Sequence, residues 1–149
     1  MKLIFHFQML VLNIFYDTKK AISELSRITN VGGIGFHQVD LRDHRDYSKP
    51  LAFLTMSDFM FSKYSKYSNC HSGNRVRHYE YINYFKENGF DCNFSPNMFA
   101  DDEYLDVLYE SMNKKYKNIG LEMLKPISGR FFIEKTGTKN TQIEVKVLK

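Results

Sequence analysis

The strongest constraint on the fold is a helical segment that ends at a glycine pair and passes directly into a strand. Apolar residues recur at helical spacing through Thr18–Asn30, and Asp17 is a candidate N-cap for this helix. Gly32 and Gly33 then end the helix, because glycine adopts the left-handed conformation at low cost. Ile34–Val39 follows as a β-branched and aromatic strand. This order of elements predicts an α/β chain.

An apolar run near the start extends this pattern. Lys2–Phe7 is typical of a short buried strand, so strand, helix and strand together predict a parallel βαβ unit. Polar residues interrupt the opening stretch, which is shorter than the roughly 20 residues needed to span a bilayer. Cys70 and Cys92 do not form a short Cys-x-x-Cys pair. We therefore expect a cytoplasmic protein without a membrane segment.

The remainder of the chain alternates between helical and strand patterns, with a polar stretch at 62–73 that predicts a loop. Asn88 and Gly89 predict a left-handed helix end. The predicted helices are Leu51–Phe61, Arg77–Asn88 and Glu103–Tyr116, and the predicted strands are Phe90–Phe94, Arg130–Lys135 and Gln142–Leu148.

Size and charge limit the class of protein. The chain has 149 residues, of which 43% are hydrophobic and 26% charged, and these values suit one globular domain. The formal net charge of +4 comes from basic residues scattered among nearly as many carboxylates. A surface of mixed charge is therefore favoured over a nucleic-acid-binding patch.

A polar segment after the strand Ile34–Val39 holds the candidate catalytic residues. His37, Asp40 and His44, with Asp43 beside them, are residue types that act as general bases toward an acceptor hydroxyl. The same groups could bind a metal, but strand alternation places His37 and Asp40 on opposite faces, so no metal site is predicted. The competing interpretation is that the aspartates cap the next segment or pair with neighbouring arginines.

A second group of polar residues precedes the predicted helix Arg77–Asn88. Asn74, Arg75 and Arg77 could hold a carboxylate or phosphate by charge-assisted hydrogen bonds, and Arg42 could join them. We assign these four residues to substrate binding. Surface pairing of the arginines with Glu80 or Asp46 is the alternative.

Four stretches of the sequence carry a family resemblance: Asp17–Ile34, His37–His44, Ser72–Arg77 and Glu87–Phe90. Together they resemble the C-terminal half of class I S-adenosylmethionine-dependent methyltransferases, including bacterial methyltransferase-domain proteins associated with glycan synthesis. The resemblance extends to about Lys135. It implies methyl transfer to a small-molecule or glycan-related acceptor.

The resemblance also implies a fold. Residues 1–135 would form a partial methyltransferase domain with the C-terminal half of a Rossmann-like sheet, mostly parallel with an antiparallel last strand. Residues 136–149 would add a hairpin strand or tail. The sheet's fourth to seventh strands would be Lys2–Phe7, Ile34–Val39, Phe90–Phe94 and Arg130–Lys135. The sheet would be open beside Lys2–Phe7, where the other half of the family fold pairs.

The cofactor-binding half of the family pattern is missing. In the family a glycine-rich loop after the first strand holds S-adenosylmethionine, and this sequence contains no such loop. Lys2 and Asn13-Ile14 also replace acidic and Glu-His positions of the family. We therefore expect no cofactor binding and no activity by this chain alone. The chain would be a truncated gene product or half of a split enzyme, completed by an N-terminal half or self-associating through Lys2–Phe7.

Two other functions remain open at this stage. One is a small basic nucleic-acid-binding module, suggested by the net charge and the abundant Tyr and Phe. The other is a metal hydrolase that uses His37, Asp40 and His44.

Overall fold

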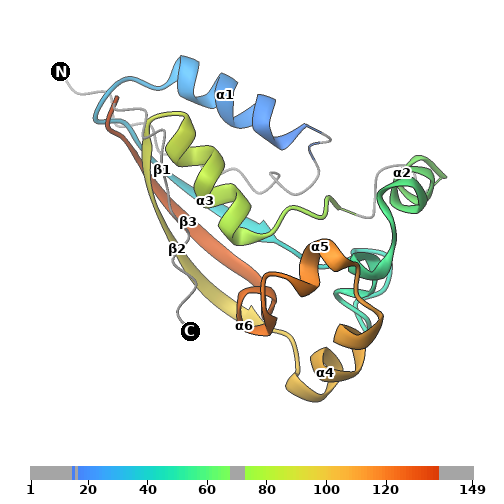
Figure 1. The fold of residues 1–149 in the computed structure, drawn as a ribbon. Helices are drawn as coiled ribbons and strands as arrows, with labels where there is room; N and C mark the ends of the chain where they lie inside the picture. The colour runs from blue at the N-terminus through green and yellow to red at the C-terminus, as the bar shows by residue number, and fades with distance from the viewer. Residues whose placement is uncertain (1–14, 16, 68–72, 138–149) are drawn as a thin grey trace.

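The computed structural model describes residue 15, residues 17–67 and residues 73–137 (Figure 1). The elements in chain order are α1 (Thr18–Ile28), β1 (Ile34–Asp40), the 3₁₀ helix η2 (Ala52–Thr55), α2 (Asp58–Tyr67), α3 (His78–Glu87), β2 (Phe90–Phe99), α4 (Asp102–Ser111), α5 (Lys114–Lys117), α6 (Leu121–Leu124) and β3 (Pro126–Lys135). Within these ranges, no helix has both the length and the apolar character needed to cross a bilayer.

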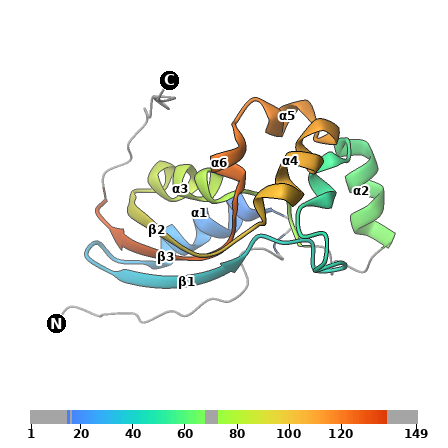
Figure 2. The ribbon, with the colours of Figure 1, turned by 90° about the horizontal axis from the view of Figure 1, so that it is seen from below.

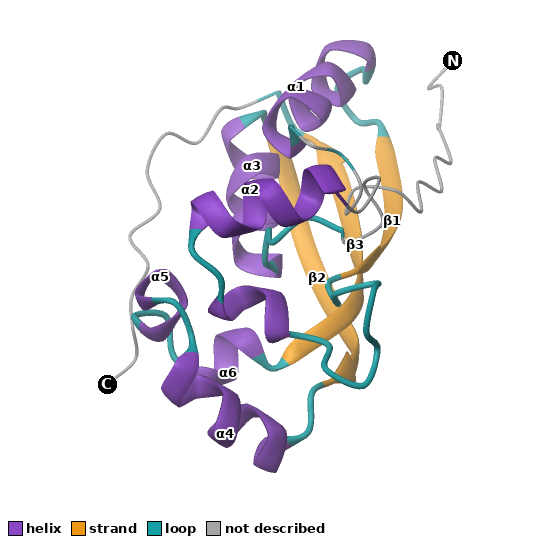
Figure 3. Cartoon of the chain, turned by 90° about the vertical axis from the view of Figure 1, so that its right-hand side faces the viewer, coloured by secondary structure: helices purple, strands orange, loops and turns teal. Residues whose placement is uncertain are grey.

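The sheet has three strands in the order β1-β3-β2, and each neighbouring pair is antiparallel. The prediction of a mostly parallel Rossmann-like half-sheet is therefore wrong. β1 and β2 run in the same direction, but they do not pair with each other. β3 lies between them and forms backbone hydrogen bonds with both (Figure 3). The predicted strands Lys2–Phe7 and Gln142–Leu148, and the open edge expected beside the first, lie outside the described residues.

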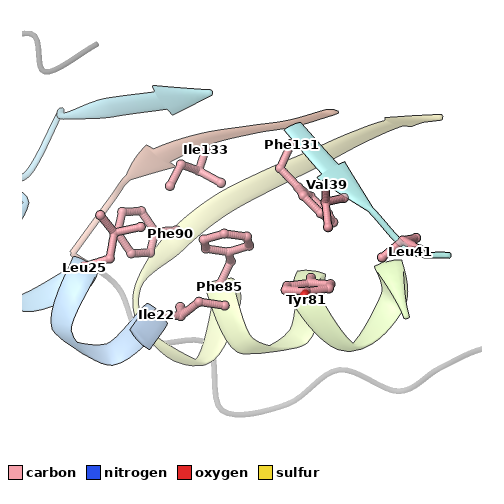
Figure 4. Close-up of a cluster of buried hydrophobic side chains, with 9 residues drawn as sticks. All are labelled: Ile22, Leu25, Val39, Leu41, Tyr81, Phe85, Phe90, Phe131 and Ile133. Atoms are coloured by element: carbon pink, nitrogen blue, oxygen red, sulfur yellow. The ribbon is translucent and has the colours of Figure 1, made fainter. Parts of the chain in front are cut away.

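One face of the sheet is covered by α1 and α3 (Figure 2). Strand alternation turns every second side chain of β1 and β3 toward these helices. Phe85 and Tyr81 of α3 meet Phe131 of β3 in this layer, with ring centroids 5.7 and 5.5 Å apart (Figure 4). We call this layer the sheet cluster; its buried members are Ile22, Leu25, Val39, Leu41, Tyr81, Phe85, Phe90, Phe131 and Ile133.

A second apolar cluster forms where the short helices gather around one end of the sheet (Figures 1 and 3). Tyr116 of α5 is fully buried in it, and the hydroxyl oxygen of Tyr104 of α4 accepts the backbone N–H of Leu51 at 3.0 Å. We call this the helical cluster; its buried members are Leu51, Phe53, Leu54, Ala100, Leu105, Met112, Tyr116, Leu124 and Ile127. The domain therefore has two adjoining cores.

Local signals in the sequence predicted the ends of α1 and α3. The carboxylate of Asp17 accepts the backbone N–H of Lys20 at 2.9 Å, which confirms the predicted N-cap. Gly89 ends α3 with a φ of 76°, as expected for a left-handed helix end.

Two predicted helices have different bounds in the structure. Within the segment predicted as the helix Leu51–Phe61, Ala52–Thr55 form the 3₁₀ helix η2, and α2 begins only after Ser57, whose hydroxyl accepts the N–H of Met60. The predicted helix Glu103–Tyr116 breaks at Asn113, whose side chain caps α5 and also donates to the carbonyl of Met56 at 3.2 Å. In both places, a polar side chain hydrogen-bonds to the backbone, and this interaction competes with the backbone hydrogen bonds of a continuous helix.

Gly129 on β3 provides a test of the tight packing between β3 and β2. A Cβ at this position would lie 2.4 Å from the ring of Phe94 and 2.8 Å from the carbonyl oxygen of Ser95. We expect Gly129→Ala to lower the free energy of unfolding by about 1 to 3 kcal/mol, because the backbone of β2 must move. Arg130→Ala, at the next and exposed position of β3, is the control and should change it by less than about 0.5 kcal/mol in chemical denaturation. Equal effects of the two changes would show that the packing is loose.

Candidate functional site

The three predicted catalytic residues do not converge. His37 lies in β1 on the face that packs against the helices, where it is fully buried and its ring stacks on Phe85 with centroids 5.8 Å apart. Asp40 and His44 lie near the end of β1, with His44 Nε2 3.6 Å from Asp40 Oδ2. The alternation of β1 explains this separation.

Asp40 is held by an arginine. The guanidinium of Arg42 donates two hydrogen bonds to its carboxylate, at 2.9 and 2.6 Å, and stacks over the ring of Tyr47. Burial alone would raise the pKa of Asp40, but the hydrogen bonds and charge of Arg42, with a smaller contribution from His44, outweigh it and lower the pKa. Asp40 is therefore a carboxylate in an ion pair, and the guanidinium of Arg42 is already occupied by this pair.

The carboxylate of Asp43 also forms hydrogen bonds within the fold. One of its oxygens accepts the hydroxyl of Tyr64 at 3.0 Å, and the other accepts the backbone N–H of Arg45 at 3.0 Å. Burial, followed by these interactions with Asp43, raises the pKa of Tyr64. In the part of the chain that the structure describes, no group of three or more His, Cys, Asp or Glu side chains could hold a metal ion.

The predicted substrate-binding residues come closer together. Asn74 and Arg75 line a cavity of about 390 Å³ between α2, the segment before α3, and α5. We call this cavity the Arg75 pocket. Arg77 is fully buried, and neither Arg77 nor Arg42 is among the lining residues of the pocket.

Arg75 is almost completely buried, and its guanidinium contacts a backbone carbonyl, an exposed carboxylate and an aromatic ring. Its guanidinium donates to the carbonyl of Met56 at 2.7 Å and pairs with the carboxylate of Asp58. It also lies 4.2 Å from the centroid of the Phe61 ring. The Asp58 side chain is 87% exposed, so solvent can replace it at little cost and free the guanidinium for a ligand.

Arg77 is a fully buried cation with incomplete hydrogen bonding. One guanidinium nitrogen donates to the carbonyl of Leu41 at 2.6 Å, while Nε and Nη1 have no partner among the described residues. Burial lowers the pKa of Arg77, and the phenol groups of Tyr116, Tyr81 and Tyr79 lie around it. A buried guanidinium in these surroundings favours an anion nearby.

The sequence did not reveal the other polar groups of the Arg75 pocket. Tyr116 lines the cavity, and its buried hydroxyl has no hydrogen-bond partner in the described structure. Lys115 Nζ lies 3.4 Å from Glu80 Oε1, and both side chains line the same cavity. Tyr116 and Lys115 lie about 40 residues beyond Arg75, so only the tertiary fold brings them together.

Asn74 has mainly a structural role. Its amide nitrogen donates to the hydroxyls of Thr18 and Tyr81 at 3.0 and 3.2 Å, and its oxygen accepts the N–H of Val76 at 3.0 Å. These bonds connect the start of α1 to α3. Asn74 therefore shapes the wall of the Arg75 pocket and has little capacity left for a ligand.

Comparison with protein-family models, curated proteins and solved structures gives no match for this chain. The resemblance to class I methyltransferases thus depends on the sequence stretches alone.

Two buried histidines predict how stability depends on pH. Burial lowers the pKa of His37 to about 4, and burial followed by the charge of Arg77 lowers that of His78 to about 4. The unfolded chain binds these protons at a pKa near 6.5, so acidification favours unfolding. We expect each histidine to reduce the free energy of unfolding by about 2 kcal/mol between pH 7 and pH 5.

Chemical denaturation at several pH values measures this loss. His37→Leu should remove about half of the loss of stability between pH 7 and pH 5. Substitution of an exposed, non-titrating side chain should leave this loss unchanged. A protein as stable at pH 5 as at pH 7 would contradict the buried, neutral state of both histidines.

Proposed function

We propose that this chain binds a small anionic molecule in the Arg75 pocket, and that this molecule is the acceptor of a methyltransferase-like protein. The observation that carries the proposal is the buried guanidinium of Arg75, which faces the cavity and is paired with a largely exposed carboxylate. The link to methyl transfer comes from the sequence resemblance. The antiparallel sheet lends it no support.

The dimensions and lining of the Arg75 pocket suit a small molecule. Its volume of about 390 Å³ lies within the range of ordinary ligand sites. Phe61 and Tyr84 offer apolar surface, while the hydroxyl of Tyr116 offers an unused hydrogen bond. A carboxylate or phosphate that replaces Asp58 would keep the charge of Arg75 neutralised and could gain a bidentate hydrogen bond.

Arg77 strengthens the preference for an anion. It is fully buried, and no described carboxylate accepts from its guanidinium. In surroundings of low polarity, its positive charge acts over a longer range than in water. A negative ligand in the neighbouring Arg75 pocket is therefore attracted by two guanidinium groups.

Methyl transfer needs a donor, and the donor site is not proposed for this chain. The sequence lacks the glycine-rich loop whose backbone N–H groups hold S-adenosylmethionine in the family that it resembles. We propose that the chain alone binds an acceptor without methylating it, and that a complementing chain supplies the cofactor.

Titration calorimetry with glucuronate and with glucose tests the proposed function. These sugars differ mainly by a carboxylate, so glucuronate should bind at least about tenfold more tightly. Arg75→Gln should remove this preference, and Asp58→Asn should tighten glucuronate binding because a competing carboxylate is lost. Arg27→Gln, in an exposed ion pair with Glu24, is the matched control and should have no effect.

Two results would contradict the proposal. Equal binding of glucose and glucuronate would show that Arg75 does not select an anion. Micromolar binding of S-adenosylmethionine to the isolated chain would show that the cofactor site is complete without a partner.

A further inference from the structure

A second cavity lies within the sheet cluster, between the end of α1 and the sheet. Its volume is about 140 Å³, and Leu25, Ile28, Phe90 and Ile133 form most of its wall. Ile28 is 57% exposed and lies at the rim, so the cavity can be reached from solvent. We call it the His37 cavity, because the imidazole of His37 is part of its lining.

The polar side chains of this cavity differ in whether they already form hydrogen bonds. The hydroxyl of Thr29 already donates to the carbonyl of Leu25 at 2.7 Å. His37 is fully buried, and neither ring nitrogen has a hydrogen-bond partner among the described residues. Burial keeps this imidazole neutral at pH 7, so one nitrogen can accept a hydrogen bond and the other can donate one.

We propose that the His37 cavity binds a single-ring aromatic alcohol, whose ring fills the apolar space and whose hydroxyl hydrogen-bonds to His37. An apolar cavity of about 150 Å³ accommodates one benzene ring in another protein, so the volume suits a ligand of this size. The unpartnered imidazole adds a requirement for a polar group, since an unsatisfied buried nitrogen gains a hydrogen bond only from such a ligand. This site is separate from the Arg75 pocket and independent of the function proposed for it.

Phenol and toluene are the probes that test the role of His37, because they have nearly the same shape. A purely apolar cavity prefers toluene, since burying a hydroxyl without a partner is costly. We therefore expect the wild-type chain to bind phenol at least as tightly as toluene. In His37→Leu, toluene should bind about tenfold more tightly than phenol. Two-dimensional NMR titration measures both affinities and locates the site through the amide signals of Thr29 and Gly35.

Two further variants cover the case in which His37→Leu does not fold. A Cβ at Gly35 would lie 3.1 Å from both His37 Nε2 and Ile133 Cγ1, so Gly35→Ala should narrow the cavity beside the imidazole and weaken binding of both probes. Phe36→Leu, on the other face of β1, is the matched control and should leave both affinities unchanged.

Three outcomes would overturn the proposal. Absence of saturable phenol shifts would mean that the cavity holds water only. A preference for toluene in the wild-type chain would mean that the imidazole does not recognise the hydroxyl. Unchanged affinities of both probes in Gly35→Ala would place them elsewhere.

Discussion

The buried guanidinium of Arg77 connects the two cores of this domain. Its hydrogen bond to the Leu41 carbonyl attaches the residue after β1 to the start of α3. Around it lie Tyr81 from the sheet cluster and Tyr116 from the helical cluster. An ion in such a place costs several kcal/mol in lost hydration, and the delocalised charge of arginine reduces that cost. The position of the helical cluster against the sheet therefore depends on a residue that is itself expensive to bury.

The free-energy cost of burying Arg77 also matters for the proposed binding site. Arg75 lies two residues before Arg77, and its guanidinium is held by Phe61, Met56 and Asp58 at the wall of the Arg75 pocket. An anion in the pocket would offset two buried positive charges at once. The same reasoning explains why the exposed Asp58 carboxylate occupies the place that a ligand would take.

The sequence predicted those parts of the structure that depend on neighbouring residues. Asp17 and Gly89 mark the helix ends because capping needs only local backbone groups. The insertion of β3 between β1 and β2 could not be predicted, since it depends on pairing of β3 with β1, about 90 to 100 residues earlier in the chain, as well as with β2. The helix break at Asn113 likewise depends on a bond to Met56, far away in the chain. For the site, charge and position indicated Arg75, but Tyr116 reaches the pocket only through the helical cluster.

An anion in the Arg75 pocket is proposed to interact with both buried arginines. An NMR spectrum of the arginine side-chain Nε–H groups, recorded with and without saturating glucuronate, tests this interaction. We expect a saturable shift of the Arg75 signal, a smaller shift of the Arg77 signal, and slow hydrogen exchange for Arg77 in both states. Arginine signals that stay unchanged at high glucuronate concentration, or a rapidly exchanging Arg77 Nε–H, would contradict it.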